Sequence, residues 1–294
     1  MAFDYVGRFA PTPSGFLHFG SLLAALASWL DARAQGGRWL LRIEDLDPPR
    51  EVPGATTAII RTLEQYGLYW DGDILRQSER QAIYRDCVET LLQQGLAYAC
   101  TCSRKQLEPF AGRYPGTCRH AGHGLTDAAI RLQVPASRYQ VQDRAQGRFA
   151  QQLEQEVGDF VIRRRDGLYA YQLAVVLDDA AQGITHVVRG ADLLDSTPRQ
   201  LYLQDVLGLP HPQYLHIPLL IAPDGHKLGK SYRSPPLLQD QVPSLLVRAL
   251  ATLGQQPPRE LLEASVAEIL RWGTDYWQPA AIPKKMTLAE AQIG

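Results

Sequence analysis

The N-terminal stretch Arg8–Leu26, RFAPTPSGFLHFGSLLAAL, places turn residues and a histidine directly before an apolar run at helical spacing. Backbone N–H groups at a helix N-terminus favour anions, and Gly15 and Gly20 allow a phosphate-bearing ligand to approach the backbone closely. His18 can donate a hydrogen bond to a phosphate oxygen. The stretch therefore indicates a phosphate site, and an ordinary strand–turn–helix with a solvent-facing histidine is the alternative.

Three of the four cysteines, Cys100, Cys102 and Cys118, lie close together in a loop-rich region. Two thiolates separated by one residue can share a tetrahedral ion, and a third thiolate from a nearby loop completes most of the ligand set. Four cysteines in 294 residues are too few for a disulfide framework, so we expect a metal before a disulfide. Metal-site chemistry favours His120 or His123 as the fourth ligand, and three free cysteines in a loop are the alternative.

The elements that must position these residues alternate between strands and helices. Residues 4–10 and 38–45 read as strands, the run after the first turn reads as a helix that ends at Gly36 and Gly37, and residues 56–66 and 79–95 read as two further helices. Residues 100–158 break this pattern as an insertion of mixed structure, after which strands and helices alternate again. The order predicts a doubly wound parallel sheet, and the chain after Pro235 reads as helical.

The composition limits the class of protein. Apolar residues make up 45% of the chain and charged residues 21%, which are globular values. The net charge of −1 excludes a protein that grips nucleic acid by bulk charge, so any RNA contact must be local. No uninterrupted apolar stretch reaches about 18 residues, and no leader segment is evident. We expect a soluble, cytoplasmic monomer that has no contact with membranes.

Three ordered motifs carry a resemblance to a known family. The stretch RFAPTPSGFLHFGS resembles the first signature of class I aminoacyl-tRNA synthetases, in the version of the glutamyl and glutaminyl branch. LRIEDLDPPR resembles the next motif of that branch, and KLGKS stands where the class carries its Lys-Met-Ser-Lys-Ser loop. Ser21 replaces the second histidine of the family's His-Ile-Gly-His tetrapeptide, and Gly229 replaces the first serine of the loop.

The resemblance implies an α/β fold, namely a doubly wound parallel-sheet (Rossmann-type) class I synthetase catalytic domain. It implies two catalytic halves at residues 1–97 and 159–235, and a zinc-binding insertion at 98–158 between them. Residues 236–294 are then a small helical remnant that resembles a stem-contact region, with no anticodon-binding domain.

The resemblance also implies roles for individual residues. The residues that would contact glutamate are Arg8, Phe9, Ala10, Pro11, Thr12, Glu44, Tyr171 and Arg189. Those that would act on ATP, together with Mg²⁺, are His18, Gly20, Ser21, Lys227 and Lys230. Planar guanidinium groups suit the two carboxylates of glutamate, and a carboxylate suits its ammonium group. For the structural zinc ion, the resemblance gives Cys100, Cys102, Tyr114 and Cys118 as ligands, with His120 as the alternative to Tyr114.

The implied activity narrows to that of short paralogues of glutamyl-tRNA synthetase. These activate L-glutamate with ATP to glutamyl-adenylate and transfer the glutamate to the queuosine base at the wobble position of tRNA(Asp). Such an acceptor lies in the anticodon loop, where unpaired bases are accessible. We keep three alternatives: a truncated glutamyl-tRNA synthetase that charges tRNA(Glu), a catalytically weakened RNA-binding paralogue, which Ser21 and Gly229 would favour, and an unrelated nucleotidyltransferase on the same fold. The basic run at 163–165 is interpreted as a solvated face and not as a site.

Overall fold

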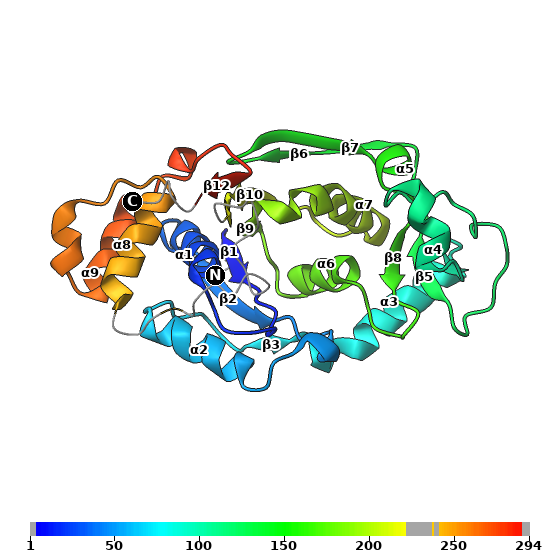
Figure 1. Cartoon of the computed structure of the whole chain (residues 1–294), viewed down its shortest axis with the longest axis horizontal. Coiled ribbons are helices and arrows are strands. Elements are labelled where there is room, and N and C mark those ends of the chain that lie inside the picture. The colour runs from blue at the N-terminus through cyan, green and yellow to red at the C-terminus, as the bar shows by residue number, and fades with distance from the viewer. Residues whose placement is uncertain (1–3, 222–236, 238–240, 290–294) are drawn as a thin grey trace.

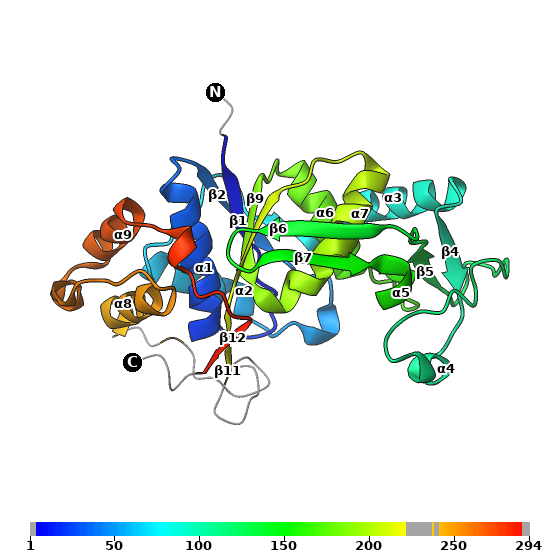
Figure 2. The same cartoon turned by 90° about the horizontal axis from the view of Figure 1, so that it is seen from above.

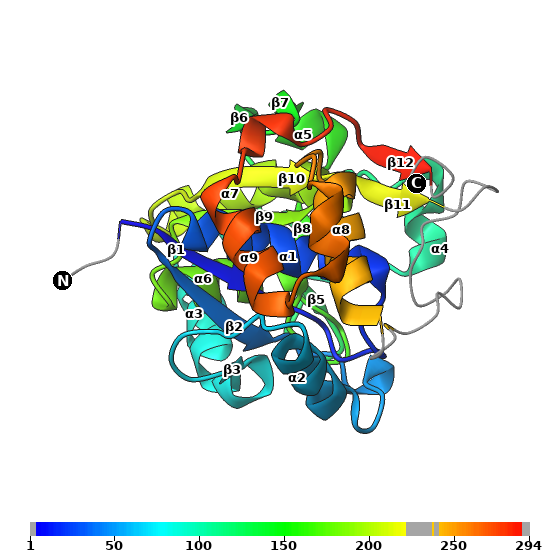
Figure 3. The ribbon, with the colours of Figure 1, turned by 90° about the vertical axis from the view of Figure 1, so that its left-hand side faces the viewer.

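The computed structural model of the chain describes residues 4–221, 237 and 241–289. Its centre is a set of short parallel strands: β1 (Val6–Phe9), β2 (Arg38–Ile43), β3 (Leu75–Arg76), β9 (His186–Gly190) and β10 (Gln213–Ile217). β2 lies between β1 and β3, and β9 pairs with β10. The backbone N–H of Thr185 donates to the carbonyl oxygen of Val6 at 2.9 Å, which joins the two groups of strands side by side (Figure 3). The predicted doubly wound parallel α/β fold is confirmed.

Helices cover both faces of this sheet (Figure 1). One face carries α1 (Phe19–Arg33), α8 (Val242–Thr252) and α9 (Val266–Asp275), and the other carries α6 (Tyr171–Ala181) and α7 (Thr197–Leu207). The two further predicted helices are present as α2 (Ala55–Gln65) and α3 (Gln81–Gln93), each within two residues of its expected ends. Because both faces are covered, the central strands are buried on both sides, as parallel strands normally are.

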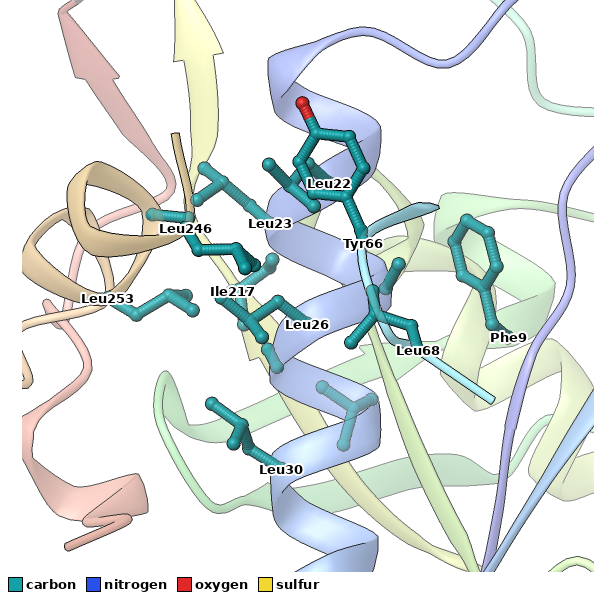
Figure 4. Packing of buried hydrophobic residues seen from close by; sticks show 14 of the residues in the cluster. Phe9, Leu22, Leu23, Leu26, Leu30, Tyr66, Leu68, Ile217, Leu246 and Leu253 are labelled. Atoms are coloured by element: carbon teal, nitrogen blue, oxygen red, sulfur yellow. The ribbon is translucent and has the colours of Figure 1, made fainter. Parts of the chain in front are cut away.

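The helix α1 is the centre of the main hydrophobic core. Leu22, Leu26 and Leu30 fall on one face at helical spacing, and each is at most 2% exposed. They pack with Leu246 of α8 and with Leu253, the residue that follows α8, among other side chains of the cluster (Figure 4). Burial of each leucine contributes roughly 2 kcal/mol relative to an exposed side chain. This packing fixes the helix whose N-terminus was predicted to bind phosphate.

The insertion forms a separate antiparallel sheet of β4 (Ala97–Cys100), β5 (Ala129–Leu132) and β8 (Phe160–Arg163). It also holds the short helices α4 (Arg104–Leu107) and α5 (Leu153–Glu156). A long hairpin of β6 (Arg138–Asp143) and β7 (Gly147–Gln152) extends from it back to the central sheet (Figure 2). Since β8 pairs with β5, the sheet of the insertion continues beyond residue 158, where the sequence placed its end.

The C-terminal segment returns to the central part of the molecule. The predicted helices are present as α8 and α9, but the chain then forms a strand, β12 (Thr287–Ala289), which was not predicted. β12 pairs in parallel with β11 (Leu219–Ile221). Within the described residues, no helix combines the length and the apolar character that crossing a membrane requires.

Asp31, near the C-terminal end of α1, binds side chains from three segments that are distant from one another in the sequence. Its carboxylate accepts hydrogen bonds from the hydroxyl of Tyr5 at 2.5 Å and from the indole N–H of Trp277 at 2.9 Å. Arg144, in the turn between β6 and β7, donates to both carboxylate oxygens at 2.6 and 2.9 Å. Asp31 is wholly buried, so removal of its carboxylate leaves several polar groups without their partner.

We expect Asp31→Ala to lower the free energy of unfolding by about 3 kcal/mol, because it leaves the Arg144 guanidinium partly buried and unpaired. Urea denaturation monitored by tryptophan fluorescence measures the change. Asp86→Ala is the matched control, since Asp86 pairs with Arg85 on an exposed surface, and it should change stability by less than about 1 kcal/mol. Equal losses in the two variants would contradict this account.

Candidate active site

A cavity of about 280 Å³ opens at the carboxyl ends of β1 and β2. Thr12 from the loop after β1, Glu44 from the end of β2 and Tyr171 at the start of α6 all line it. Ligands of doubly wound sheets bind outside the carboxyl ends of the strands. Three of the residues predicted to contact glutamate therefore meet at the expected edge of the sheet.

Glu44 is held at this edge by backbone and charge. Its N–H donates to the carbonyl oxygen of Pro11 at 3.0 Å, which fixes the loop after β1 against the end of β2. Its carboxylate lies 3.5 Å from a guanidinium nitrogen of Arg42. Burial raises the pKa of the Glu44 carboxyl, and the nearby Arg42 and Arg8 offset this only in part.

Arg8 points at a carboxylate that it shares with a second arginine. Its Nε lies 3.1 Å from Asp179 Oδ1, and Arg42 Nη2 lies 2.8 Å from the same oxygen. Arg42 Nη1 also donates to Gln182 at 2.8 Å. Burial alone would raise the pKa of Asp179, but the two guanidinium groups hold it below its usual value. Asp179 therefore stays ionised and orients Arg8.

Arg189, on β9, contacts Tyr171, one of the residues that line the cavity. Its Nη1 donates to the hydroxyl of Tyr171 at 3.4 Å, so the two residues predicted to contact glutamate are neighbours. Its Nη2 donates to Thr197 Oγ1 at 2.9 Å and to the carbonyl oxygen of Leu193 at 3.2 Å, and its Nε donates to His216 Nε2 at 3.0 Å. The side chain is nearly wholly buried and its direction is fixed.

The other predicted glutamate contacts divide into two kinds. Ala10 and Pro11 lie in the loop after β1 and are partly exposed. The side chain of Phe9 instead lies in the hydrophobic core, where its ring stacks on that of Trp39 at 6.2 Å. Its side chain is thus part of the core and does not line the cavity.

The predicted phosphate-binding residues lie at the N-terminus of α1. His18 is the N-cap, and its carbonyl oxygen accepts from the N–H of Leu22 at 3.0 Å. Gly20 and Ser21 lie in the first turn, which contains no acidic residue, so the positive end of the helix dipole is not neutralised by the helix itself. Gly15 adopts a φ of 144°, a conformation that favours glycine.

A second cavity of about 690 Å³ lies beside this helix end and is lined by Phe16 and Leu17 together with residues of α2. Lys227 and Lys230, predicted to close over the phosphates, lie outside the described residues, as does Gly229.

The three clustered cysteines converge as predicted. The sulfur atoms of Cys100, Cys102 and Cys118 all lie within 4.8 Å of one another, with Cys102 and Cys118 3.4 Å apart. A tetrahedral zinc ion with thiolate ligands places its sulfur atoms about 3.8 Å apart. The donor set and its spacing fit a metal ion.

Tyr114 lies in the same cluster. Its hydroxyl is 3.4 Å from Cys100 Sγ and accepts the backbone N–H of Cys118 at 2.9 Å. Gly158, with a φ of 73°, packs against the Tyr114 backbone so closely that a Cβ would lie 2.1 Å from its carbonyl oxygen. Arg131 covers the tyrosine ring at 3.8 Å and donates to Cys100 Sγ at 3.2 Å. The phenol oxygen thus lies within 3.9 Å of two of the three sulfur atoms.

The two histidines are placed differently. His120 and His123 are both exposed, and His123 lies 3.3 Å from Thr101 Oγ1. In the part of the chain that the structure describes, neither joins the group of potential metal ligands. Cys87, the remaining cysteine, is partly buried in α3.

Several residues of the site were missed from the sequence. Arg42 and Asp179 orient Arg8, and His216 with Asp143 holds Arg189. The adjacent acids Asp178 and Asp179 within an apolar helix were the available signal, because buried carboxylates require charged partners. His216 gave no such signal, since one histidine in an apolar strand is typical of a core residue.

Comparison with known proteins gives a consistent result. Residues 5–263 match the family model described as tRNA synthetases class I (E and Q), catalytic domain. The chain is 71% identical over 289 residues to the glutamyl-Q tRNA(Asp) synthetase of Ectopseudomonas mendocina, with 98% of each chain covered. It is 68% identical over 293 residues to the protein of that name from Pseudomonas aeruginosa, with 100% of each covered.

A solved structure shows the same fold. The crystal structure of a glutamate tRNA ligase from Elizabethkingia meningosepticum in complex with its amino acid superposes with a TM-score of 0.81 at 24% identity. The match covers 97% of this chain and 67% of the ligase.

Proposed function

This chain belongs to the class I tRNA synthetases of the glutamate and glutamine type, and on that basis we propose that it is an ATP-dependent ligase that transfers glutamate to queuosine in tRNA(Asp). The enzyme activates L-glutamate as glutamyl-adenylate and then transfers it to the queuosine base at the wobble position. The acceptor follows from the names of the relatives that match the full length of the chain.

The observation that carries the proposal for the amino acid is the charge of the buried site. Arg8, Arg42 and Arg189 contribute three positive charges, and Glu44 and Asp179 contribute two negative charges, so these five buried residues carry a net charge of +1. L-Glutamate carries two carboxylates and one ammonium group, a net charge of −1. Glutamine is neutral overall and would leave one buried guanidinium without an anion, which is costly.

The roles of the side chains follow from this complement. Arg8 and Arg189 bind the carboxylates of glutamate, and Glu44 accepts hydrogen bonds from its ammonium group. The Tyr171 hydroxyl, 3.4 Å from Arg189, adds a neutral donor at the same wall of the cavity. Ala10, Pro11 and Thr12 supply backbone and hydroxyl contacts from the loop after β1.

Activation requires stabilisation of developing charge on phosphate. A carboxylate oxygen of glutamate attacks the α-phosphorus of ATP, and the bond to pyrophosphate breaks. His18 and the first-turn N–H groups of Gly20 and Ser21 stabilise that charge, assisted by Lys227 and Lys230. Mg²⁺, when bound, neutralises phosphate charge. The acceptor group on queuosine then attacks the carbonyl carbon, and AMP leaves.

Transfer of labelled glutamate in the presence of ATP tests the proposal. We expect label on queuosine-containing tRNA(Asp), and none on the same tRNA without queuosine or on tRNA(Glu). Label on tRNA(Glu) would instead identify a minimal aminoacylating synthetase. Absence of label on all three RNAs, with a folded protein, would favour an RNA-binding paralogue without catalysis.

The raised pKa of Glu44 predicts how acid affects glutamate binding. Protonated Glu44 loses its charge attraction for the substrate ammonium, so kcat/KM for glutamate should fall as pH falls. The fall should begin above the pH at which an ordinary glutamate is protonated, because burial raises this pKa.

The matched variant Glu44→Gln should reduce kcat/KM at neutral pH by at least about tenfold and should lack this acid limb. Initial rates of adenylate formation between about pH 5 and pH 8 measure both the loss in kcat/KM and the acid limb. An identical acid limb in the variant would assign the titration to another group.

We propose that the cysteine cluster holds a structural zinc ion with Tyr114 as the fourth ligand. Tyr114→Phe should weaken zinc binding by at least about tenfold, whereas His120→Ala should leave it unchanged. Competition with a chromophoric chelator measures the affinity, and elemental analysis measures the zinc content. The opposite pattern would make His120 the fourth ligand. Full retention of zinc in Cys118→Ser would show that the cysteine cluster does not hold the ion.

The proposal includes a cytoplasmic location and a monomeric state. Light scattering of the purified protein tests the monomeric state, because one chain has a mass of 32.7 kDa.

A further inference from the structure

Behind Arg189 lies a buried histidine that no step above uses. Nε2 of His216 accepts from Arg189 Nε at 3.0 Å, and Nδ1 of His216 lies 2.6 Å from a carboxylate oxygen of Asp143. Both His216 and Asp143 have fully buried side chains. The three residues connect the end of β6 to Tyr171, which lines the cavity.

The chemistry of the two neighbours fixes the state of the imidazole. A guanidinium can only donate hydrogen bonds, so Nε2 must carry a lone pair where it faces Arg189. An ionised carboxylate can only accept, so Nδ1 must carry the proton where it faces Asp143. His216 is therefore neutral and present as the Nδ1–H tautomer. Burial, together with the nearby charge of Arg189, lowers the pKa of His216, in agreement with this state.

Asp143 is itself firmly held. One of its oxygens accepts the backbone N–H groups of Ala145 at 3.0 Å, Gln146 at 2.8 Å and His216 at 3.2 Å. Burial alone would raise the pKa of Asp143, but the bonds from His216 and from the turn lower it. The carboxylate is thus kept ionised, and its other oxygen is directed at Nδ1 of His216.

The contacts of Arg189 account for nearly all of its donors. Of the five N–H groups, one points to His216, two to Thr197 and Leu193, and one to Tyr171. Among the described residues, this leaves one N–H on Nη1, the nitrogen next to the Tyr171 hydroxyl. Loss of the bond from Nε would leave only the Nη1 and Nη2 contacts to set the orientation of the guanidinium plane.

We propose that His216, held as the neutral Nδ1–H tautomer by Asp143, is a positioning residue that directs the guanidinium of Arg189 at a carboxylate of glutamate. The inference rests on the proposed function, in which Arg189 binds glutamate. A purely structural role is the competing explanation, since His216 and Asp143 also join the hairpin turn to β10.

Two substitutions separate these explanations. His216→Gln places an amide oxygen near the former Nε2 and so retains an acceptor for Arg189, while it gives up the bond to Asp143. His216→Asn places an amide N–H near the former Nδ1 and so retains the bond to Asp143, while it leaves Arg189 Nε without an acceptor. A positioning role requires the glutamine variant to have the lower KM for glutamate, and a structural role requires the asparagine variant to have the lower KM.

We expect His216→Asn to raise KM for glutamate by about tenfold or more, with little change in KM for ATP, because one hydrogen bond to a charged group is lost. We expect His216→Gln to remain within about threefold of the parent chain. Steady-state adenylate formation measures these constants, and thermal unfolding reports whether each variant is folded. Equal values for both variants, or a worse glutamine variant, would overturn the proposal.

Asp143→Asn provides a second, independent variant. Its amide oxygen can still accept the backbone N–H groups of the turn, but its amide nitrogen would donate to Nδ1 and force the proton of His216 onto Nε2. That proton would then face the N–H of Arg189, and KM for glutamate should rise as in His216→Asn. An unchanged KM in this variant would refute the role of the tautomer.

Arg189→Ala distinguishes failure of the inference from failure of the proposed function. If this variant binds glutamate as well as the parent chain, Arg189 is not a glutamate ligand and the proposed site is wrong. If it loses glutamate binding while both His216 variants retain it, the site stands and the positioning role of His216 is wrong.

Discussion

Asp179 places one buried carboxylate between the two buried guanidinium groups of Arg8 and Arg42. Without it, two like charges would face each other in a medium that screens them poorly. The same helix, α6, carries Asp178, which Arg80, Gln77 and Tyr84 contact at 2.6 to 2.8 Å, and begins with Tyr171. The docking of α6 on β1 and β2 therefore assembles the site as one unit, and a shift of this helix would disturb several charged groups together.

Arg8 and Arg189 are oriented by partners of different charge. Arg8 shares the carboxylate of Asp179 with Arg42, whereas Arg189 faces a neutral imidazole and neutral oxygen atoms. The charge of Arg189 is therefore fully available to a ligand, while the charge of Arg8 is offset in part by Asp179. The cavity thus attracts an anion more strongly at one wall than at the other, which suits a substrate with an ammonium group near one of its two carboxylates.

The periodic features of the sequence predicted the framework well. The leucines of α1 and the apolar run of β2 predicted which side chains are buried. The cysteine spacing predicted a cluster because the three cysteines lie near one another in the sequence. The partners of the arginines could not be predicted in this way. Asp179 lies 171 residues from Arg8, and His216 lies 73 residues from Asp143, so only the fold brings each pair together. The strand β12 was missed because its three residues are too few to show a period.

The bond between Asp31 and Trp277 spans 246 residues of chain, and it has a consequence for the order of events during synthesis. Ribosomes add about 5 to 20 residues per second, so the carboxylate of Asp31 waits roughly 12 to 50 s for its last partner. During that time α1 lacks the residues of α8 and α9 that pack against it, and its apolar side chains are open to other chains. The nascent protein is therefore expected to depend on chaperones that shield this helix until translation ends.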